Sequence, residues 1–136
     1  MRIVFMMTVA LSMVMAEPTM VKDPKTNLVW EDTLHTTEEK VTYIEAKAYC
    51  ETLSLGAFDN WRIPALTELL SIVDYTRYKP AALKEFKHVD NNTLYWSSTA
   101  YAKSSTEYWG VVFKDGATDD SSETYGRYVR CVRDIK

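Results

Sequence analysis

Few residues in this sequence of 136 residues are of a type that performs catalysis, and their spacing does not favour it. The two histidines, His35 and His88, form neither an H-x-x-x-H nor an H-E-x-x-H pattern, and no G-x-S-x-G elbow or glycine-rich phosphate loop is present. His35 lies near Glu38 and Glu39, a weak metal-ligand set, but polar loop residues of this kind are more often solvated. We therefore expect no enzyme activity, no cofactor and no metal.

The two cysteines, Cys50 and Cys131, allow two interpretations. A thiol-redox or metal-binding pair usually has C-x-x-C spacing, which is absent here. Two distant cysteines in an oxidising compartment favour a structural disulfide, which would close a loop of about 80 residues. We favour the disulfide.

Aromatic residues interleave with cations in the second half of the chain, a composition that suits stacking and hydrogen bonding to a glycan or a protein surface. Trp109 alternates with Val111 and Phe113, which favours burial of its ring over display. The acidic stretches at 90–92 and 118–120 offer few convergent oxygens for calcium and are interpreted as surface loops. The candidate ligand-binding residues are Tyr101, Trp109, Tyr125, Arg127 and Arg130.

The first sixteen residues have the layout of a secretory signal peptide. Arg2 is followed by residues 3–15 without a charged side chain, and Ala16 precedes Glu17. The apolar run is shorter than the roughly 18 to 20 residues that cross a bilayer, so we expect no membrane anchor. Cleavage after Ala16 is expected to release residues 17–136 as one domain, periplasmic or secreted.

The charge of the mature chain argues against nucleic acid as a partner. The sequence holds 16 basic and 19 acidic residues, and removal of Arg2 leaves 15 against 19, a net charge of −4. The overall basic field that nucleic-acid binding requires is therefore absent.

A first helix is predicted over residues 42–56. Thr42 and Glu45 form a capping box at its start, and Gly56 supplies a C-terminal stop. Cys50 shares the apolar face of this helix with Ala46, Tyr49 and Leu53 and is expected to point inward.

A second helix is predicted after the stretch WRIP at 61–64, because apolar residues recur over 66–73 at i, i+3, i+4 and i+7. Its start is poorly capped, since Ala65 cannot accept a backbone N–H. Trp61 and Arg62 either form a site at this helix start or are framework that fixes the helix to the fold.

The remaining patterns predict strands and turns. A hairpin opens the mature chain around the turn residues DPKTN, and a loop follows the second helix. The order of hairpin, two helices and antiparallel sheet gives an α+β fold. The later segments are a loop at 78–92, strands at 94–100, 107–113 and 127–133, a turn at 114–116 and a polar loop at 118–126.

The last predicted strand sorts its residues onto two faces. Val129, Cys131 and Arg133 share one face, while Tyr128, Arg130 and Val132 share the other. If the disulfide forms, Val129 and Cys131 face the first helix and Arg130 lies on the opposite side of the sheet.

Five motifs in order across the mature chain resemble the Legionella collagen-like protein C-terminal domain family, formerly a domain of unknown function. The motifs are DPKTNLVW at 23–30, AKAYC at 46–50, WRIPALTEL at 61–69, YWSST at 95–99 and VRCVR at 129–133. The family is similar to the C-type-lectin-like superfold shared with formylglycine-generating enzymes, in which a first-helix cysteine bridges to the last strand. The resemblance thus implies two helices packed on a small antiparallel sheet, with a disulfide from Cys50 to Cys131.

The resemblance also implies a function. It indicates an exported, noncatalytic binding or adhesion module, with polysaccharides, including sulfated ones, as the ligand class. A protein-interaction or envelope-structural role without glycan binding is the alternative. Formylglycine-generating chemistry needs reactive cysteines beyond a structural bridge, and the sequence has none.

The resemblance favours a framework role over a ligand-binding role for the WRIP stretch. Arg62 precedes Glu68 by six residues, close enough for a charge-assisted pair if the chain turns, and Trp61 is expected to pack beneath the second helix. Two departures from the family pattern are Asn27 in place of Gly and Ala65 in place of Ser or Thr, the latter expected to weaken the helix start by roughly 1 kcal/mol. The structural motif residues are Trp30, Trp61, Arg62, Pro64, Glu68, Trp96, Ser97 and Ser98.

Overall fold

The computed structural model describes residues 3–5 and 18–135. The predicted signal peptide therefore lies almost wholly outside the described residues. Within the described ranges, none of the helices has the length and apolar character needed to cross a membrane.

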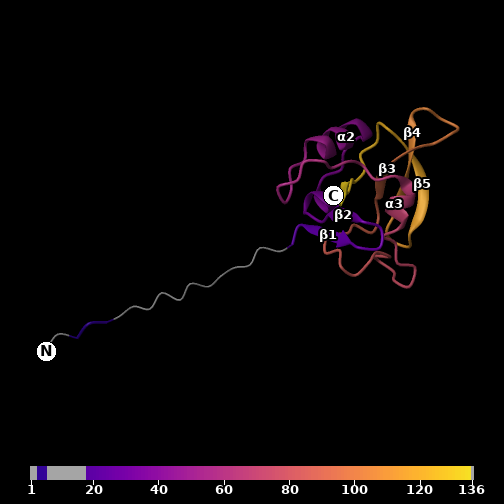
Figure 1. Ribbon diagram of the computed structural model, residues 1–136. Coiled ribbons are helices and arrows are strands. Elements are labelled where there is room, and N and C mark those ends of the chain that lie inside the picture. The colour runs from indigo at the N-terminus through magenta and orange to yellow at the C-terminus, as the bar shows by residue number, and fades with distance from the viewer. Residues whose placement is uncertain (1–2, 6–17, 136) are drawn as a thin grey trace.

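Three short helices and six strands make up the described chain. The strands form two three-stranded antiparallel sheets, in the orders β1-β2-β6 and β3-β4-β5, where a single sheet was predicted. The α+β class is confirmed. Figure 1 shows α2 and the β3-β4-β5 sheet on opposite sides of the folded body. The elements are β1 Met20–Asp23, β2 Leu28–Glu31, α1 His35–Glu38, α2 Tyr43–Thr52, α3 Leu66–Leu70, β3 Leu94–Ala100, β4 Glu107–Val112, β5 Ala117–Ser122 and β6 Val132–Asp134.

The first hairpin forms as its turn residues predict. The Asp23 carboxylate accepts the Lys25 N–H at 3.0 Å and the Thr26 hydroxyl at 2.8 Å, an arrangement that closes the turn locally. Asn27 has a φ of 57°, the left-handed region that Asn tolerates better than most residues. β1 and β2 then pair from Asp23 and Leu28 outward.

Helix α2 starts where predicted and ends earlier. The Glu45 N–H donates to the Thr42 hydroxyl at 3.4 Å, and the Thr42 N–H donates to the Glu45 carboxylate at 2.9 Å, which confirms the capping box. The prediction of helix as far as Gly56 is wrong. Extended backbone follows the helix, and this places Leu53 and Leu55 against the buried residues around the disulfide.

Helix α3 has a better start than Ala65 alone allows. The Ala65 N–H donates to the Glu68 carboxylate at 2.9 Å, and the Leu66 N–H donates to the Thr99 hydroxyl of β3 at 2.9 Å. A hydroxyl from a distant strand therefore replaces the cap that the helix itself lacks. The weakening expected from Ala65 is offset by this contact.

Strand β5 was not predicted, because residues 118–126 were interpreted as a loop, and the short helix α1 was not predicted either. Strand β5 pairs with β4 along its whole length, from Glu107 opposite Ser122 to Val112 opposite Ala117. A polar edge strand lacks the apolar alternation that marks a half-buried strand, so the pairing is set by the preceding turn and by β4. Gly116, with a φ of 84°, closes that turn.

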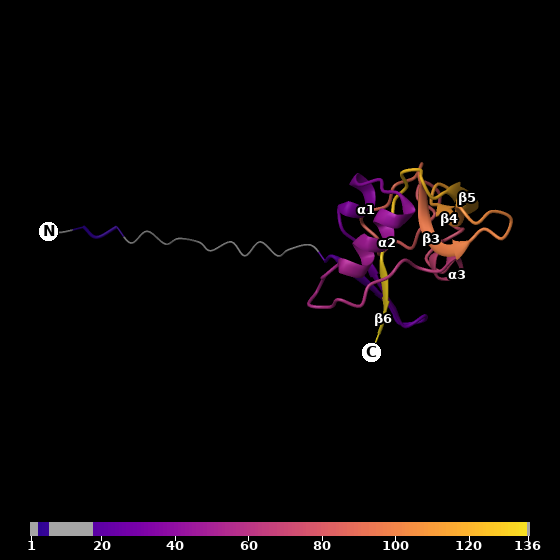
Figure 2. The same ribbon diagram turned by 90° about the horizontal axis from the view of Figure 1, so that it is seen from above.

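The last segment is only partly regular, although residues 127–133 were predicted to be one strand. Arg127 and Tyr128 make single bridges to Val41 and Tyr95, after which the chain crosses to the other sheet and pairs as β6. The predicted two-sided alternation is nevertheless present. Figure 2 shows β6 beside α2.

Alternating residues of β2, β3 and the last segment divide between two hydrophobic cores. Trp30 and Tyr95 point into the core that includes α3, while Val29 and Trp96 point into the core around the disulfide. The last segment follows the same rule and sends neighbouring residues to different cores. These strands hold the two halves together because each contributes to both.

The predicted disulfide is confirmed. Cys50 of α2 and Cys131 are joined with a Cα–Cα distance of 5.5 Å, and both are fully buried. The bond spans 81 positions and ties α2 to the segment that leads into β6.

Candidate functional site

The WRIP stretch forms a framework contact between α3 and β6. The Arg62 guanidinium donates to both Glu68 carboxylate oxygens, at 2.7 and 2.8 Å, and to Asp134 at 3.2 Å. The hydrogen bond from Arg62 lowers the pKa of Glu68, although partial burial acts in the opposite direction. Trp61 does not pack beneath α3 as expected: it lies in the disulfide core and donates its indole N–H to the Phe58 carbonyl at 3.1 Å.

Glu68→Gln is expected to lower the free energy of unfolding by about 1 kcal/mol near pH 7, since Arg62 is 38% exposed and solvent screens the pair. The folded-state pKa of Glu68 is depressed, so its stabilising contribution is present above the ordinary pKa of about 4.3 and is lost as pH falls through the lower folded value. Urea unfolding near pH 7 and at about pH 2.5 measures this. An equal deficit at both pH values, or a deficit matched by the exposed control Glu39→Gln, would contradict the ion pair's role.

The other motif residues are mostly structural. Trp30 and Trp96 are fully buried, and the Ser97 hydroxyl donates to the Trp109 carbonyl at 2.6 Å. The Ser98 N–H donates to the Pro64 carbonyl at 2.8 Å, which joins β3 to the WRIP stretch. The side chain of Ser98 itself is exposed.

Four of the predicted ligand residues form two separate pairs. Tyr101 and Trp109 meet edge to face at 5.2 Å between ring centroids, both half-buried. The Arg127 guanidinium lies 5.7 Å from the exposed Tyr125 ring and donates to the Ser121 hydroxyl at 3.0 Å. Ser121 of β5 is paired with Tyr108 of β4, and successive residues of a strand point to opposite faces of the sheet. Ser121 therefore lies on the face opposite Trp109. The two pairs therefore do not converge on one site.

Arg130 does not belong to a surface site, and its prediction as a ligand residue is corrected. Its side chain is 1% exposed and donates to the Asp32 carboxylate at 3.1 Å and to the Glu31 carbonyl at 2.6 Å. It also donates to the His88 carbonyl and lies over the Phe86 ring at 4.8 Å. The guanidinium thus joins β2 to the loop that precedes β3.

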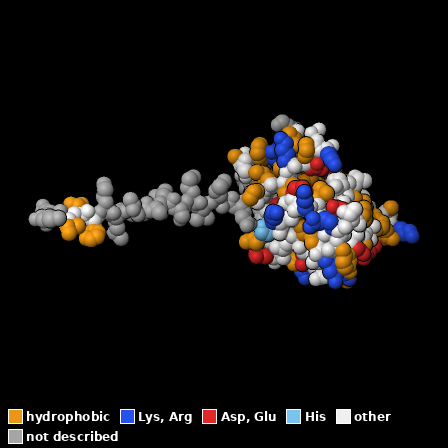
Figure 3. Space-filling model, turned by 90° about the horizontal axis from the view of Figure 1, so that it is seen from below, with side chains coloured by type: hydrophobic (Ala, Val, Ile, Leu, Met, Phe, Trp, Pro, Cys, Tyr) orange, Lys and Arg blue, Asp and Glu red, His pale blue; other side chains and the backbone are white. Residues whose placement is uncertain are grey.

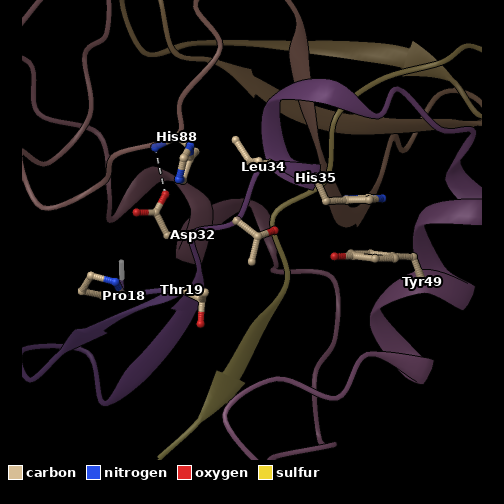
Figure 4. Close-up of a pocket in the computed structure, with 8 residues that line it drawn as sticks. Pro18, Thr19, Asp32, Leu34, His35, Tyr49 and His88 are labelled. Atoms are coloured by element: carbon tan, nitrogen blue, oxygen red, sulfur yellow. Dashed lines mark hydrogen bonds between the residues drawn. The ribbon is translucent and has the colours of Figure 1, made fainter. Parts of the chain in front are cut away.

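A different set of polar residues converges in a pocket of about 520 Å³ between β2, α1, α2 and the loop at His88. Both histidines of the chain line it, although 53 positions separate them. Figure 4 shows Leu34 between the Asp32–His88 side and the His35–Tyr49 side. We call this the histidine pocket; it is lined by Pro18, Thr19, Asp32, Thr33, Leu34, His35, Tyr49 and His88.

The α2 wall of the histidine pocket is fixed by a buried carboxylate. Glu31 is fully buried and accepts hydrogen bonds from the Tyr49 and Thr33 hydroxyls and from the Cys131 N–H. Burial, followed by the hydrogen bond to Glu31, raises the pKa of Tyr49. The His35 ring stacks on Tyr49 at 3.7 Å. The pocket wall is therefore held in place before any ligand arrives.

The Asp32 carboxylate is engaged by a buried cation and by two backbone N–H groups, which makes it a poor candidate for a catalytic base. One oxygen accepts the Arg130 guanidinium at 3.1 Å and the His88 N–H at 3.0 Å, and the other accepts the Lys87 N–H at 2.8 Å. Among the described residues, no three histidine, cysteine, aspartate or glutamate side chains are arranged to hold a metal ion. The pocket instead presents hydroxyl oxygens and two imidazoles, which suit hydrogen bonding to a ligand rich in hydroxyl groups.

A match to a known domain family covers most of the chain. The sequence profile of the Lcl C-terminal domain matches residues 19–133, which include both cysteines, strands β1 to β5 and the first two residues of β6. The chain belongs to the Lcl C-terminal domain family. A comparison with curated proteins finds no match.

The histidine pocket of this Lcl C-terminal domain was not predicted from the sequence. His35 drew attention only as a metal ligand beside Glu38 and Glu39, and its stacking partner Tyr49 was assigned to the apolar face of a helix. The sequence held only a weak signal, the two acids at 31–32 directly after the apolar residues 28–30, because acidic residues at such a position are usually exposed.

Proposed function

We propose that this Lcl C-terminal domain is an exported, noncatalytic, C-type-lectin-like module that binds a glycan in the histidine pocket. The observation that carries the proposal is the convergence of three hydroxyl groups and two imidazoles around a pocket whose Asp32 carboxylate is paired with Arg130. The buried disulfide supports export, since such bonds persist in oxidising compartments. Recovery of a secreted or periplasmic form whose intact mass lacks residues 1–16 tests the export.

The chemistry of the pocket favours binding over hydrolysis. Glycoside hydrolysis uses two carboxyl groups that flank the scissile bond, one of them free to exchange a proton. Here Asp32 is held in a buried ion pair, and Glu31 lies beneath the wall with three donors on it. The Thr33 and Tyr49 hydroxyls, whose protons are donated to Glu31, can accept hydrogen bonds from a sugar, and the Thr19 hydroxyl can donate or accept. Exposed Leu34 offers contact to the C–H groups of the sugar.

The surface charge does not restrict the ligand to acidic glycans. Figure 3 shows lysine and arginine side chains interspersed with acidic and apolar ones on one face, with a histidine at the surface. No continuous basic field covers that face, so affinity for a polyanion would depend on local contacts. The proposal therefore includes neutral and acidic glycans.

His88→Ala is expected to weaken glycan binding roughly tenfold, the effect of losing one good hydrogen bond in a pocket. A glycan array at low and moderate salt identifies the ligands, and titration of each ligand with both proteins gives the ratio. Lys87→Ala is the matched control, because that side chain is exposed and its backbone contact to Asp32 is retained. Equal affinities for His88→Ala and wild type would contradict the pocket assignment.

The alternative is a protein-interaction or envelope-structural domain without glycan binding. It is favoured by large apolar side chains at the surface, with Ile44 76% and Tyr75 71% exposed. An array that stays silent at every salt concentration, with a folded protein, would support this alternative and contradict glycan recognition.

A further inference from the structure

We infer that a second groove, which flanks α2 on the side away from the histidine pocket, binds one neutral sugar ring. The inference extends the proposed function to a second contact with the glycan, and it rests on that function. The groove has a volume of about 230 Å³. We call it the α2 groove; it is lined by Tyr43, Lys47, Glu51, Arg62, Ile63 and Ser98.

Helical spacing places the α2 residues of this groove in one line. Tyr43, Lys47 and Glu51 are four residues apart and lie on one stripe of the helix. Tyr49 lies on the other flank of the buried face that Ala46 and Cys50 define, as expected for 3.6 residues per turn. The two cavities therefore adjoin opposite flanks of the same helix.

The opposite wall of the α2 groove is built from two sequence motifs that are distant along the chain. Arg62 and Ile63 come from the WRIP stretch, and Ser98 comes from YWSST in β3. The hydrogen bond from the Ser98 N–H to the Pro64 carbonyl holds these motifs side by side. Framework residues and groove residues therefore belong to the same motifs.

One side chain of each wall, Tyr43 on α2 and Arg62 opposite it, is held in place without a ligand. The Tyr43 ring stacks on Tyr108 at 3.5 Å and meets Trp96 edge-on at 5.8 Å. Burial, with smaller contributions from Tyr108 and Glu51, raises the pKa of Tyr43 to about 12. Arg62 is fixed by its two carboxylate partners. Tyr43 and Arg62 would therefore lose little conformational entropy on binding, whereas Lys47 and Glu51 would become ordered.

The polar groups that face the α2 groove retain hydrogen-bonding capacity. Lys47 and Glu51 are exposed, and within residues 18–135 neither forms an ion pair or a side-chain hydrogen bond. The Ser98 hydroxyl likewise has no partner in that range. The groove thus offers an ammonium donor, a carboxylate acceptor and a hydroxyl that does both.

The charge balance selects a neutral ligand over an anionic one. Arg62 already faces the carboxylates of Glu68 and Asp134, and Lys47 is offset by Glu51 one turn away. A sulfate or carboxylate group would therefore meet no net positive charge. Adjacent hydroxyl groups of a neutral ring suit one donor and one acceptor, and the ring's C–H groups would lie against Tyr43.

Titration of ¹⁵N-labelled protein with glucose, galactose, mannose and N-acetylglucosamine, and with 6-sulfated glucose and galactose, tests the inference. We expect at least one neutral sugar to shift the amide signals of Lys47, Glu51 and Ser98, with an affinity unchanged between low and moderate salt. Glu51→Gln and Lys47→Ala should each weaken that binding about tenfold, while the exposed controls Glu39→Gln and Lys22→Ala should not.

His88→Ala separates this inference from the proposed function. Groove shifts that persist in His88→Ala and disappear in Glu51→Gln support a second, independent sugar contact. Shifts confined to the histidine pocket overturn the groove and leave the proposed function standing. Groove shifts with the sulfated sugars alone, or no shift with any sugar in a folded protein, also overturn the inference.

Discussion

Replacing Cys50 and Cys131 together by alanine is expected to lower the free energy of unfolding by roughly 4.5 kcal/mol, the chain-entropy value for closing a loop of this length. The bond spans 81 positions and joins α2 to the segment before β6. Both cysteines are fully buried in the core that also holds Trp61 and Trp96. A loss of this size is a large fraction of the stability of a small domain.

Urea unfolding of the oxidised wild type, the reduced wild type and the double alanine variant measures the contribution of the disulfide. The reduced protein and the variant should be destabilised to a similar degree, because both release the same loop. A loss under about 1 kcal/mol in the variant would show that the two cores hold α2 without the covalent bond.

Arg130→Met is expected to lower the free energy of unfolding by about 3 to 5 kcal/mol, because it leaves the buried Asp32 carboxylate without its cation. Both side chains are almost fully buried, at 1% and 2% exposure. The substitution also removes the donors to the Glu31 and His88 carbonyls. Methionine fills much of the volume, so the loss reports mainly on the unpaired polar groups.

A double-mutant cycle with Asp32→Asn isolates the ion pair. The double variant should be less destabilised than the sum of the single variants, because removing both charges avoids an isolated buried charge. Additive losses would contradict direct coupling between Arg130 and Asp32. His88 donates its backbone N–H to the same carboxylate, so both single variants should also disturb the histidine pocket.

Local signals predicted much of the fold. The capping box at Thr42 and Glu45 fixed the start of α2, and the alternation around Cys131 correctly sorted the last segment onto two faces. β5 escaped prediction because its polar residues carry no apolar period, and their pairing is decided by β4. The helix end near Gly56 was also wrong, since packing of Leu53 and Leu55 in the disulfide core outweighs a local stop signal.

The candidate site was less predictable, because it is assembled by contacts between distant segments. Arg130 has the composition of a surface ligand residue, and only its position between β2 and the His88 loop shows that it is buried. The pairing of Arg62 with Glu68 was foreseeable, since both lie in one short stretch. His35 and His88 share no local pattern, so their common pocket emerges only in three dimensions.

Mapping amide shifts of the labelled protein with a glycan selected on the array tests glycan recognition by the histidine pocket most directly. The structure predicts perturbations at Thr19, Thr33 and His88, weakened in His88→Ala and retained in Lys87→Ala. Perturbations confined to Trp109 and its strand neighbours, or an absence of binding by the folded protein, would contradict it.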